Sequence, residues 1–561
     1  MSAVEKQVRA AWTQPSRKST DFEHWKRVFW ENASDYCSST TLHGYRYLTE
    51  DGLHWIERLM WVTVHIMATW GVSYSILDVW QDYLNAPIFT TVHTTAYPIS
   101  KISFPAVAVC SNNKISYKRA RRLTEQLASS RNVSAEELFN LIPNMGRMFD
   151  FNDRGREQVQ LLHEMLTANN HTYNVTNLML KMSPSCEALV VRCKWGGRKE
   201  SCRTLFTQRR TMEGFCCTFN YVRDRDDFVV LAGNQELEDN AEYPDDDEND
   251  ERIKRASIPG SNMGLSIVVN SEIDDYYFPL ISSYGTKVLL FKPNDYPDTA
   301  SGGLVEHLVP VGAEVSLRLQ ATSVYADASI KGFTLKQRGC LFKSELSQLF
   351  AGSYSFSDCV ISCRVRSIRT LCGCTPFFYP SLGASRTCDL SDIDCLARYA
   401  DKWTTLRPAR QVPGLEKERE VSISCEECRP ACSDTSYHVQ TTWAGLSRRR
   451  YESSDFLDGL TNLSGHSMVH LFFGTGTTTR FEKQVLYYWY DLLSNFGGIC
   501  GLFVGFSLIS VVELVYFFTV RFLLLARDRN RRPGHAATLK SPQLTGIYWR
   551  EVAPSLRVGR H

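Results

Sequence analysis

Residues 496–520 read FGGICGLFVGFSLISVVELVYFFTV, twenty-five consecutive residues in which Glu513 is the only charged side chain. An α-helix rises about 1.5 Å per residue, and about 20 apolar residues suffice to cross the roughly 30 Å hydrocarbon layer of a bilayer. The segment therefore predicts a membrane-spanning helix that is long enough to tilt.

A second apolar segment lies near the N-terminus, where residues 59–77 read LMWVTVHIMATWGVSYSIL with His65 as the only ionisable group. Tryptophans in and around it suit the headgroup level of a membrane; they are Trp55, Trp61, Trp70 and Trp80. The segment predicts a first membrane helix. We expect His65 to be packed or hydrogen-bonded there, with a role as a pH sensor as the alternative.

Basic residues flank both segments on one side. RFLLLARDRNRR (521–532) follows the second segment, and Lys26, Arg27, Arg46 and Arg58 precede the first. Positive charge favours the cytoplasmic side, so both termini are expected in the cytoplasm of a two-pass plasma-membrane protein. The polar first fifty residues show no cleavable signal peptide.

This topology leaves about 400 residues outside the cell, and sixteen of the eighteen cysteines fall there, between Cys110 and Cys432. Disulfides form in that oxidising compartment. The predicted regions are a cytoplasmic segment (1–57), a first span (58–79), an ectodomain (80–485), a pre-pore segment with the second span (486–520) and a cytoplasmic tail (521–561). Glycosylation is expected at the ectodomain sequons Asn132, Asn170, Asn174 and Asn462, but not at the cytoplasmic Asn32.

The overall composition is that of an ordinary globular chain, with 43% hydrophobic and 22% charged residues and a formal net charge of +2. It argues against disorder, collagen or a coiled coil as the main architecture, and against a polybasic nucleic-acid binder. Nucleophile-elbow (G-x-S-x-G) and zinc-helix (H-E-x-x-H) motifs are missing, so an enzyme is not expected. No cofactor or resident metal is expected either.

β-like runs recur through the predicted ectodomain, at residues 102–110, 265–269, 288–291 and 315–319, around a more helical stretch at 114–180. They predict an α+β domain. The acidic run 245–251, followed by Arg-Ile-Lys-Arg at 252–255, is interpreted as a solvated loop. A processing-protease site after Arg255 is the alternative.

Ten cysteines lie between Cys340 and Cys432. Cys359 and Cys363 would share one face if residues 357–372 are helical. Ten cysteines admit about 945 pairings, so spacing alone does not select one. Cys425-Glu-Glu-Cys428 could be a redox or zinc pair, but outside the cell and without a histidine cluster this is the weaker interpretation.

Four features in this order, within about residues 37–525, resemble the epithelial sodium channel/degenerin family, most closely its insect pickpocket branch. They are Leu42-His43-Gly44, FPAVAVC at 104–110, the C-x3-C-x8-C-x-C block at 359, 363, 372 and 374, and LLSNFGGICGLFVGFSLISVVEL at 492–514. The resemblance implies a hand-like ectodomain, as in acid-sensing ion channels, on a trimer around a pore.

The resemblance also implies a function. The chain would be a subunit of a voltage-independent cation channel, selective for sodium and sensitive to amiloride, gated by an extracellular chemical or mechanical stimulus. Its partners would be related subunits in a homo- or heterotrimer, membrane lipid and permeating sodium ions, with no nucleic acid. A non-conducting two-pass receptor or adhesion protein is the alternative.

The resemblance further implies disulfide pairs. In the part called the thumb, the pairs would nest as Cys340–Cys432, Cys359–Cys428, Cys363–Cys425, Cys372–Cys395 and Cys374–Cys388. Three more pairs would be Cys110–Cys217, Cys186–Cys193 and Cys202–Cys216, with the choice between Cys216 and Cys217 left open.

In the second span, Gly505-Phe506-Ser507 matches the selectivity tripeptide of the family, although Phe506 is larger than the usual middle residue. Ser494 matches a position that permits pore closure, and His43-Gly44 matches a cytoplasmic gating motif. Ser494, Gly498, Gly501 and Gly505 would form one stripe on a helix, lining the pore or packing against another helix. Glu513 would belong to an acidic ring or form an interhelical hydrogen bond.

Overall fold

The computed structural model describes residues 17–85, 87–151, 155–223, 251–345, 354–380, 385–407, 414, 416, 421–446, 456–457, 460 and 465–527. The chain divides into two compact units, Met1–Tyr83 with Tyr487–His561, and Leu84–Leu486. We call them the terminal unit and the central unit. The central unit corresponds in extent to the predicted ectodomain, 80–485.

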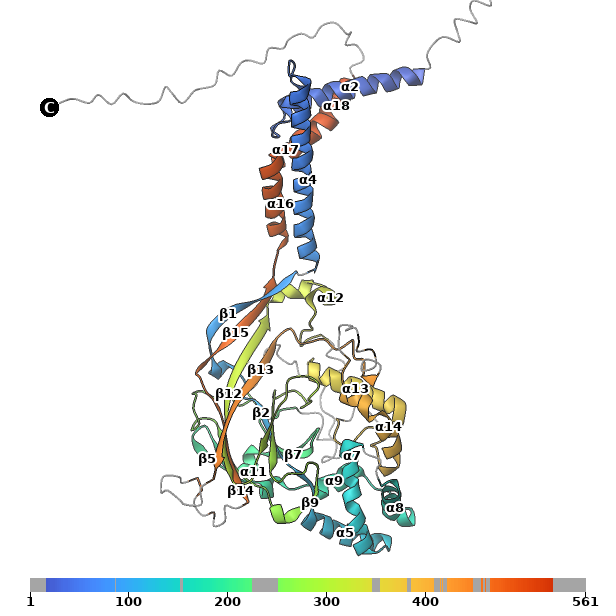
Figure 1. The fold of residues 1–561 in the computed structure, drawn as a ribbon, viewed down its shortest axis with the longest axis vertical. Coiled ribbons are helices and arrows are strands. Elements are labelled where there is room, and N and C mark those ends of the chain that lie inside the picture. Colours follow the sequence, from blue (N-terminus) through green and yellow to red (C-terminus); the bar gives the residue numbers. More distant parts are fainter. Residues whose placement is uncertain are drawn as a thin grey trace, which may run out of the picture. The chain divides into compact units, whose positions relative to one another are not determined.

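Two large sheets organise the central unit (Figure 1). The eight-stranded sheet has the order β1-β15-β12-β14-β8-β4-β5, with β13 also paired to β12. Its strands are β1 (Ile88–Pro98), β4 (Val190–Trp195), β5 (Arg198–Glu200), β8 (Leu265–Asn270), β12 (Ala313–Ala326), β13 (Asp434–Gly445), β14 (His466–Phe473) and β15 (Thr477–Val485). The five-stranded sheet has the order β11-β10-β2-β7-β6, with strands β2 (Ala106–Ser111), β6 (Thr207–Thr211), β7 (Gly214–Phe219), β10 (Thr286–Phe291) and β11 (Val305–Val309). A small sheet pairs β3 (Asn113–Ser116) with β9 (Tyr276–Pro279).

Alternation along the strands explains how the two sheets share a core. In β12, Val315, Leu317 and Leu319 are buried while the residues between them are more exposed. They join a cluster with Val107 and Val109 of β2. Strand β2 is buried along its whole length, because its other side chains enter a second cluster. A strand covered on both faces is continuously apolar, as the run predicted at 102–110 is.

Helices cover a further part of the central unit and share one apolar core. They are α5 (Tyr117–Arg131), α6 (Ala135–Leu141), α7 (Arg147–Asp150), α8 (Arg156–Thr167), α9 (Val175–Met182), α13 (Phe356–Cys372) and α14 (Ile393–Thr404), with short α10 (Cys186–Leu189), α11 (Cys202–Leu205) and α12 (Leu335–Arg338) elsewhere. Side-chain caps fix several starts: Ser116, Ser134, Asn174 and Ser355 each accept a backbone N–H. The predicted helix at 357–372 is α13.

The five predicted thumb disulfides are all present: Cys340–Cys432, Cys359–Cys428, Cys363–Cys425, Cys372–Cys395 and Cys374–Cys388. Cys425 and Cys428 therefore belong to two different disulfides, which excludes a redox or zinc pair at that motif. Because Cys359 and Cys363 lie one helical turn apart, they join the same stretch of chain to α13.

The other three predicted pairs are wrong. The structure joins Cys110 to Cys216, Cys186 to Cys217 and Cys193 to Cys202. In the sheet, Val109 lies opposite Cys217, so the next residue, Cys110, lies opposite Cys216. Neighbouring residues of a strand point to opposite faces. Cys216 therefore faces Cys110, and Cys217 faces α10 and Cys186 on the other side.

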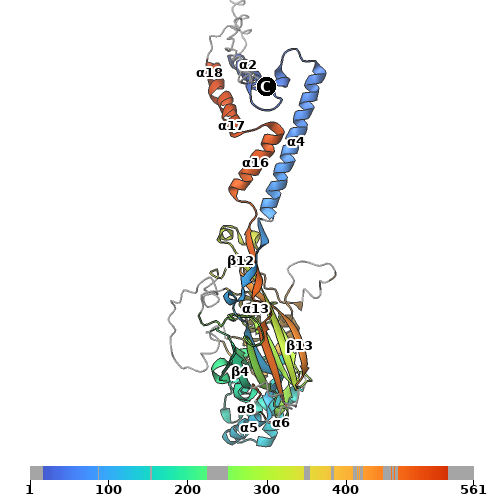
Figure 2. The same ribbon diagram turned by 90° about the vertical axis from the view of Figure 1, so that its left-hand side faces the viewer.

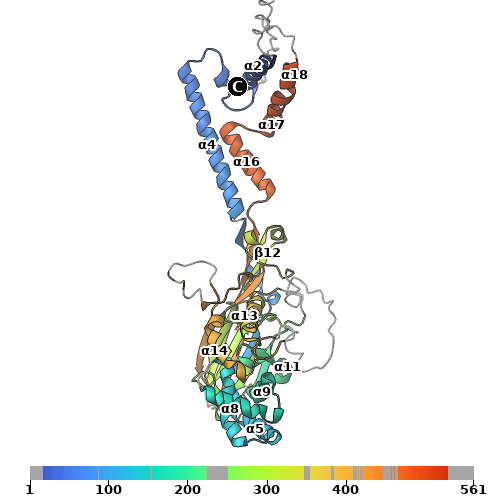
Figure 3. The same ribbon diagram turned by 90° about the vertical axis from the view of Figure 1, so that its right-hand side faces the viewer.

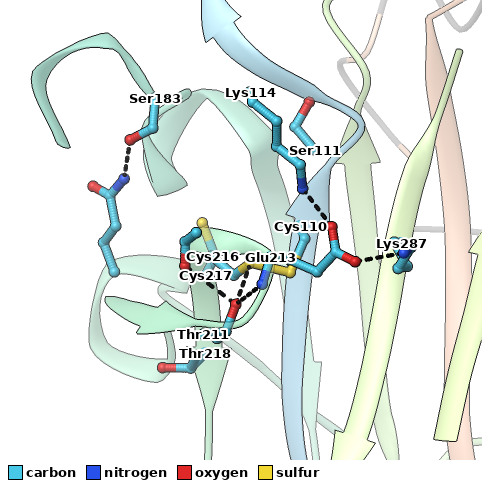
Figure 4. The surroundings of a disulfide bond; sticks show 12 residues. Cys110, Ser111, Lys114, Ser183, Thr211, Glu213, Cys216, Cys217, Thr218 and Lys287 are labelled. Atoms are coloured by element: carbon cyan, nitrogen blue, oxygen red, sulfur yellow. Dashed lines mark hydrogen bonds and ion pairs between the residues drawn. A yellow bond between two sulfur atoms is a disulfide. The ribbon is translucent and has the colours of Figure 1, made fainter. Parts of the chain in front are cut away.

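A group of buried charges lies beside the Cys110–Cys216 disulfide (Figure 4). Glu213, at the tip of the β6–β7 hairpin, accepts from Lys114 Nζ at 2.7 Å and from Lys287 Nζ at 2.5 Å. Burial alone would raise the pKa of Glu213, but the two ammonium groups lower it to about 2. Burial also lowers the pKa of Lys114. The hairpin is thus held by disulfides at its base and by ion pairs at its tip.

The segment that follows the acidic run is anchored to the folded core through Ile253, Ala256 and the backbone of Lys254, whereas Arg252 and the Lys254 side chain are exposed and residues 245–250 lie outside the described residues. Ile253 and Ala256 are each 3% exposed. The N–H of Lys254 donates to Asn220 Oδ1 at 2.7 Å, and its carbonyl accepts from the N–H of Phe104 at 3.0 Å. The backbone of 253–256 is thus attached to the core, while Glu251, the described residue of the acidic run, is exposed, and the interpretation of that run as a solvated loop stays a prediction.

The terminal unit is helical. Its elements are α2 (Arg17–Ser39), α3 (Arg46–Thr49), α4 (Trp55–Asn85, whose last residues enter the central unit), α16 (Trp489–Val504), α17 (Leu508–Val515), a π-helical segment (Tyr516–Arg521) and α18 (Phe522–Arg527). Within the described chain, one stretch, Leu508–Leu525, combines the length and apolarity needed to cross a bilayer. The predicted first span lies within α4, a 31-residue helix.

Candidate functional site

The predicted second span is two helices and not one. Helix α16 ends at Val504, residues 505–507 are non-helical, and α17 starts at Leu508. Gly505 ends α16 in the left-handed conformation, with φ +72° and ψ +22°. Figure 2 shows the change of direction between the two helices. The predicted four-residue stripe is therefore wrong at its last member, because Gly505 lies beyond the helix that carries Ser494, Gly498 and Gly501.

Local hydrogen bonds define this break, which consists of the predicted selectivity tripeptide Gly505-Phe506-Ser507. The N–H of Gly505 donates to the Gly501 carbonyl at 3.0 Å, and that of Phe506 donates to the Cys500 carbonyl at 3.3 Å. Ser507 caps α17: its Oγ accepts from the N–H of Ser510 at 3.2 Å, and Ser510 Oγ accepts from the N–H of Ser507 at 3.2 Å. The tripeptide thus ends one helix and starts the next.

The predicted gating motif lies directly against this break. The N–H of His43 donates to the Val504 carbonyl at 3.0 Å, in the last turn of α16. A Cβ atom at Gly505 would lie 2.7–2.8 Å from the imidazole ring of His43. Only glycine therefore fits at 505, for two reasons: the positive φ and the contact with His43.

Gly44 follows His43 and packs against helix α4. Its φ is +74°, and a Cβ there would lie 3.1 Å from the Trp61 ring and 3.3 Å from the His65 ring. The His65 ring also lies 4.5 Å from the Tyr45 ring, centroid to centroid. His65 is thus packed against the segment that carries the motif, as expected from its apolar surroundings.

Glu513 is bonded to the same N-terminal segment. Thr41 Oγ1 donates to Glu513 Oε2 at 3.3 Å, and the Thr41 N–H lies 3.5 Å from the same oxygen. Thr41 Oγ1 also lies 3.3 Å from Ser510 Oγ, which is fully buried. Thr41 lies in the non-helical segment between α2 and α3, so this bond is not the interhelical hydrogen bond of the sequence analysis, and the two interpretations of Glu513 stay predictions.

The remaining predicted pore residues lie on a face of α16 that the chain leaves open. Ser494 and Gly498 are exposed, and a Cβ atom added at Gly498 would meet nothing within 4 Å. At Gly501 the nearest atom is the Phe506 carbonyl oxygen, 4.0 Å away. This open face is available to lipid, to ions or to another chain.

Sequence reasoning missed three residues of this unit: Thr41, Ser510 and Asn32. Asn32 is fully buried, and its Nδ2 donates to the Phe517 carbonyl at 2.9 Å in the π-helical segment. Ser510 was detectable in principle as a polar residue three positions after Ser507, the spacing of a cap. Nothing in the sequence connects Thr41 or Asn32 to residues almost 500 positions away.

Three of the four predicted glycosylation asparagines are exposed on the helical part of the central unit: Asn132, Asn170 and Asn174. Asn132 and Asn170 both have positive φ at helix ends, and Asn174 caps α9. The fourth, Asn462, lies outside the described residues. Asn32 is buried and bonded to the Phe517 carbonyl, and its exclusion as an acceptor, which rests on the expected cytoplasmic side, stays a prediction.

Comparison with known proteins agrees with this arrangement. A family described as "Amiloride-sensitive sodium channel" matches residues 36–517. Sodium channel protein Nach of Drosophila melanogaster is 25% identical over 507 residues, covering 90% of this chain and 89% of that protein. Pickpocket protein 28 of the same organism is 25% identical, covering 89% and 80%. The epithelial sodium channel subunit gamma of Rattus norvegicus is 21% identical, covering 91% and 83%.

The family match covers most of the chain, from the N-terminal segment before His43 to the π-helical segment after Glu513. The fold, the eight disulfides of the central unit and the broken helix of the terminal unit all lie within it. The chain therefore belongs to the amiloride-sensitive sodium channel family, a family of ion channels and not of enzymes.

Proposed function

We propose that this chain is a subunit of a sodium-selective cation channel, a trimer of this chain alone or with related subunits. It crosses the plasma membrane twice, through α4 and through α16 to α18, with both termini in the cytoplasm. The channel is voltage-independent, blocked by amiloride and opened by a stimulus that acts on the ectodomain. Membrane lipid and sodium ions are its other partners.

The observation that supports conduction best is the break at residues 505–507. Non-helical backbone at membrane depth is tolerated only where protein surrounds it or where it lines a water-filled cavity. At this break the backbone carbonyls leave the regular helical hydrogen-bond pattern, and the Ser507 hydroxyl, which caps α17, is the one side-chain oxygen of the tripeptide. Oxygen atoms of this kind replace part of the hydration shell of a cation in selectivity filters.

The contacts of Thr41 and His43 support control of the same place from the cytoplasmic side. His43 bonds to the last turn before the break, and Thr41 bonds to Glu513 beyond it. Movement of residues 41–44 would release both sides of the break together. We infer that residues 41–44 determine whether residues 505–507 adopt the closed or the open geometry of the pore.

The test is voltage-clamp recording of the full chain, alone and with related subunits, with external sodium replaced by a large organic cation. Gly505→Ala should reduce the sodium current at least tenfold at equal surface abundance, because of its φ of +72° and the nearby His43 ring. Gly497→Ala is the matched control, since a Cβ there meets nothing within 4 Å. If the wild-type chain reaches the cell surface but gives no sodium current, either alone or with related subunits, the non-conducting receptor is favoured.

A further inference from the structure

The N-terminal helix α2 has one face bound to the end of the apolar span. Val28, Asn32 and Tyr36 recur every four residues, and all three are buried. Tyr36 packs on the rings of Phe517 and Phe518, each with a centroid distance of 5.4 Å. These residues account for the core-facing side of the helix.

Electrostatic and ring contacts extend this attachment along α2, which lies beside α18 (Figure 3). Asp35 accepts from Arg521 at 2.6 Å, and the Trp25 ring lies 5.5 Å from the Phe522 ring. Residues 517–522 belong to the end of the Leu508–Leu525 stretch, of which 6% is buried within the chain. Helix α2 therefore lies at the level where the apolar span ends.

Trp30 of α2 is 65% exposed. Its neighbour Phe29 is 43% exposed, but the Phe29 ring packs on the Phe518 and Phe522 rings, with centroid distances of 6.0 and 6.3 Å. Lys26, Arg27 and Glu31 close to Trp30 are exposed as well, and Glu23 lies about one helical turn before Lys26 and Arg27. Exposed tryptophan beside lysine and arginine, on a helix at the end of a membrane span, is the pattern of an interfacial helix.

We propose that α2 lies in the cytoplasmic membrane interface, with Trp30 at the headgroup level and Lys26 and Arg27 on anionic lipid headgroups. A lipid surface fits better than a protein partner, because the exposed Trp30 lies on a helix whose other aromatic residues, Trp25 and Phe29, pack on the end of the apolar span. Basic residues close to a membrane are attracted by the negative potential of anionic lipids. The inference depends on the membrane position of Leu508–Leu525 and not on conduction.

The test is hydrogen exchange of residues 25–36 in the full chain, reconstituted in nanodiscs of phosphatidylcholine alone or with 30% phosphatidylglycerol. Exchange should be about three times slower with the anionic lipid. The double variant Lys26→Gln/Arg27→Gln should abolish that difference, and Trp30→Ser should speed exchange in both nanodiscs. Trp443→Ser is the matched control, because Trp443 is 68% exposed on strand β13 of the central unit.

Trp30 lies off the packed face, so the exchange of α4 should be unchanged in Trp30→Ser and would report any general unfolding. Equal exchange of α2 in the two nanodiscs, or no effect of Trp30→Ser, would overturn the proposal. Protection that appears only after addition of soluble cytosolic protein would overturn it as well. No current is measured, so a failure of the conduction hypothesis gives a separate result.

Discussion

The central and terminal units obtain their structure in opposite ways. Every disulfide in the described residues lies in the central unit, whereas the two free cysteines, Cys37 and Cys500, lie in the terminal unit. The central unit has buried apolar clusters, but α4 has no buried residue. The central unit is thus stabilised by its own cross-links and apolar clusters, whereas the terminal unit leaves much of its apolar surface exposed.

The largest expected effect is at the buried charges of the central unit. Glu213→Ala would leave Lys114, whose side chain is 5% exposed, without the carboxylate to which it is bonded. Loss of one partner of a buried ion pair destabilises by about 3–5 kcal/mol. We expect most of the protein to be retained inside the cell, measured as surface abundance and thermal unfolding in detergent.

Glu187→Ala is the matched control for this prediction, because Glu187 pairs with Arg203 at the surface, with side chains 63% and 75% exposed. Such pairs contribute about 0–1 kcal/mol. Equal loss of surface protein in both variants would show that the buried ion pairs contribute no more to the stability of the central unit than the exposed pair does.

The second prediction concerns the thumb disulfides. Cys363→Ser and Cys425→Ser should each lower the free energy of unfolding by about 2–4 kcal/mol, because both remove the same cross-link. The double variant should be no worse than either single variant. Cys500→Ser in the terminal unit should change surface delivery little. If mass spectrometry found these cysteines as free thiols in the surface protein, disulfides would not be what stabilises the central unit.

The third prediction moves to the terminal unit, where the effect should be on gating and not on folding. Ser494 is exposed in the single chain, so Ser494→Val removes no buried contact of the terminal unit. If three copies meet around the pore, overpacking costs about 1–3 kcal/mol per site and opens the channel. The readout is standing sodium current normalised to surface protein. Normal surface abundance without added current would remove Ser494 from the gate.

The smallest expected effect is pH dependence in the eight-stranded sheet. His470 of β14 lies 2.8 Å from Ser266 Oγ on β8 and 3.2 Å from Glu314 Oε1 on β12. Burial lowers the pKa of His470, Glu314 opposes that change, and Lys194 of β4 adds to it. The unfolded chain therefore takes up the proton first as the pH falls below about 6.5.

Stability should consequently be complete above about pH 6.5 and should fall as the pH drops towards the folded pKa. One proton changes the free energy of unfolding by at most about 1.4 kcal/mol per pH unit. His470→Gln should flatten this dependence, measured by thermal unfolding of the full chain between about pH 7.5 and about pH 5. The exposed His171→Gln serves as control; an identical slope in all three proteins would exclude His470.

Periodic and local features could be predicted from the sequence, because they depend on neighbours in the chain. The strand at 288–291 follows from a continuous apolar run and the strand at 315–319 from apolar alternation. A helix at 357–372 was the condition for Cys359 and Cys363 to share one face, and α13 meets it. The five thumb pairs followed from the family resemblance. The alternation that makes Cys216 and Cys217 face opposite sides was also visible, but their partners depend on a register set by β2 and β7. A shift of one residue exchanges the two faces.

The pore segment shows the same limit more strongly. An apolar run predicts a helix, and the run at 496–520 contains no proline that would mark an interruption. At the break Gly505 lies against the His43 ring, which comes from 462 positions earlier in the chain. A contact across that separation leaves no periodic signal. The motif residues were identified, but their contact was not.

The nested thumb disulfides also impose an order on biosynthesis. The pairs enclose one another, with sequence separations of 14, 23, 62, 69 and 92 residues. During synthesis from the N-terminus, Cys340, Cys359, Cys363, Cys372 and Cys374 all enter the secretory lumen before Cys388, the first of their partners. Five thiols therefore wait together, each able to form a wrong bond with another. Closure of the shortest loop, Cys374–Cys388, brings the next two cysteines together, so correct pairing can proceed from the innermost pair to the outermost.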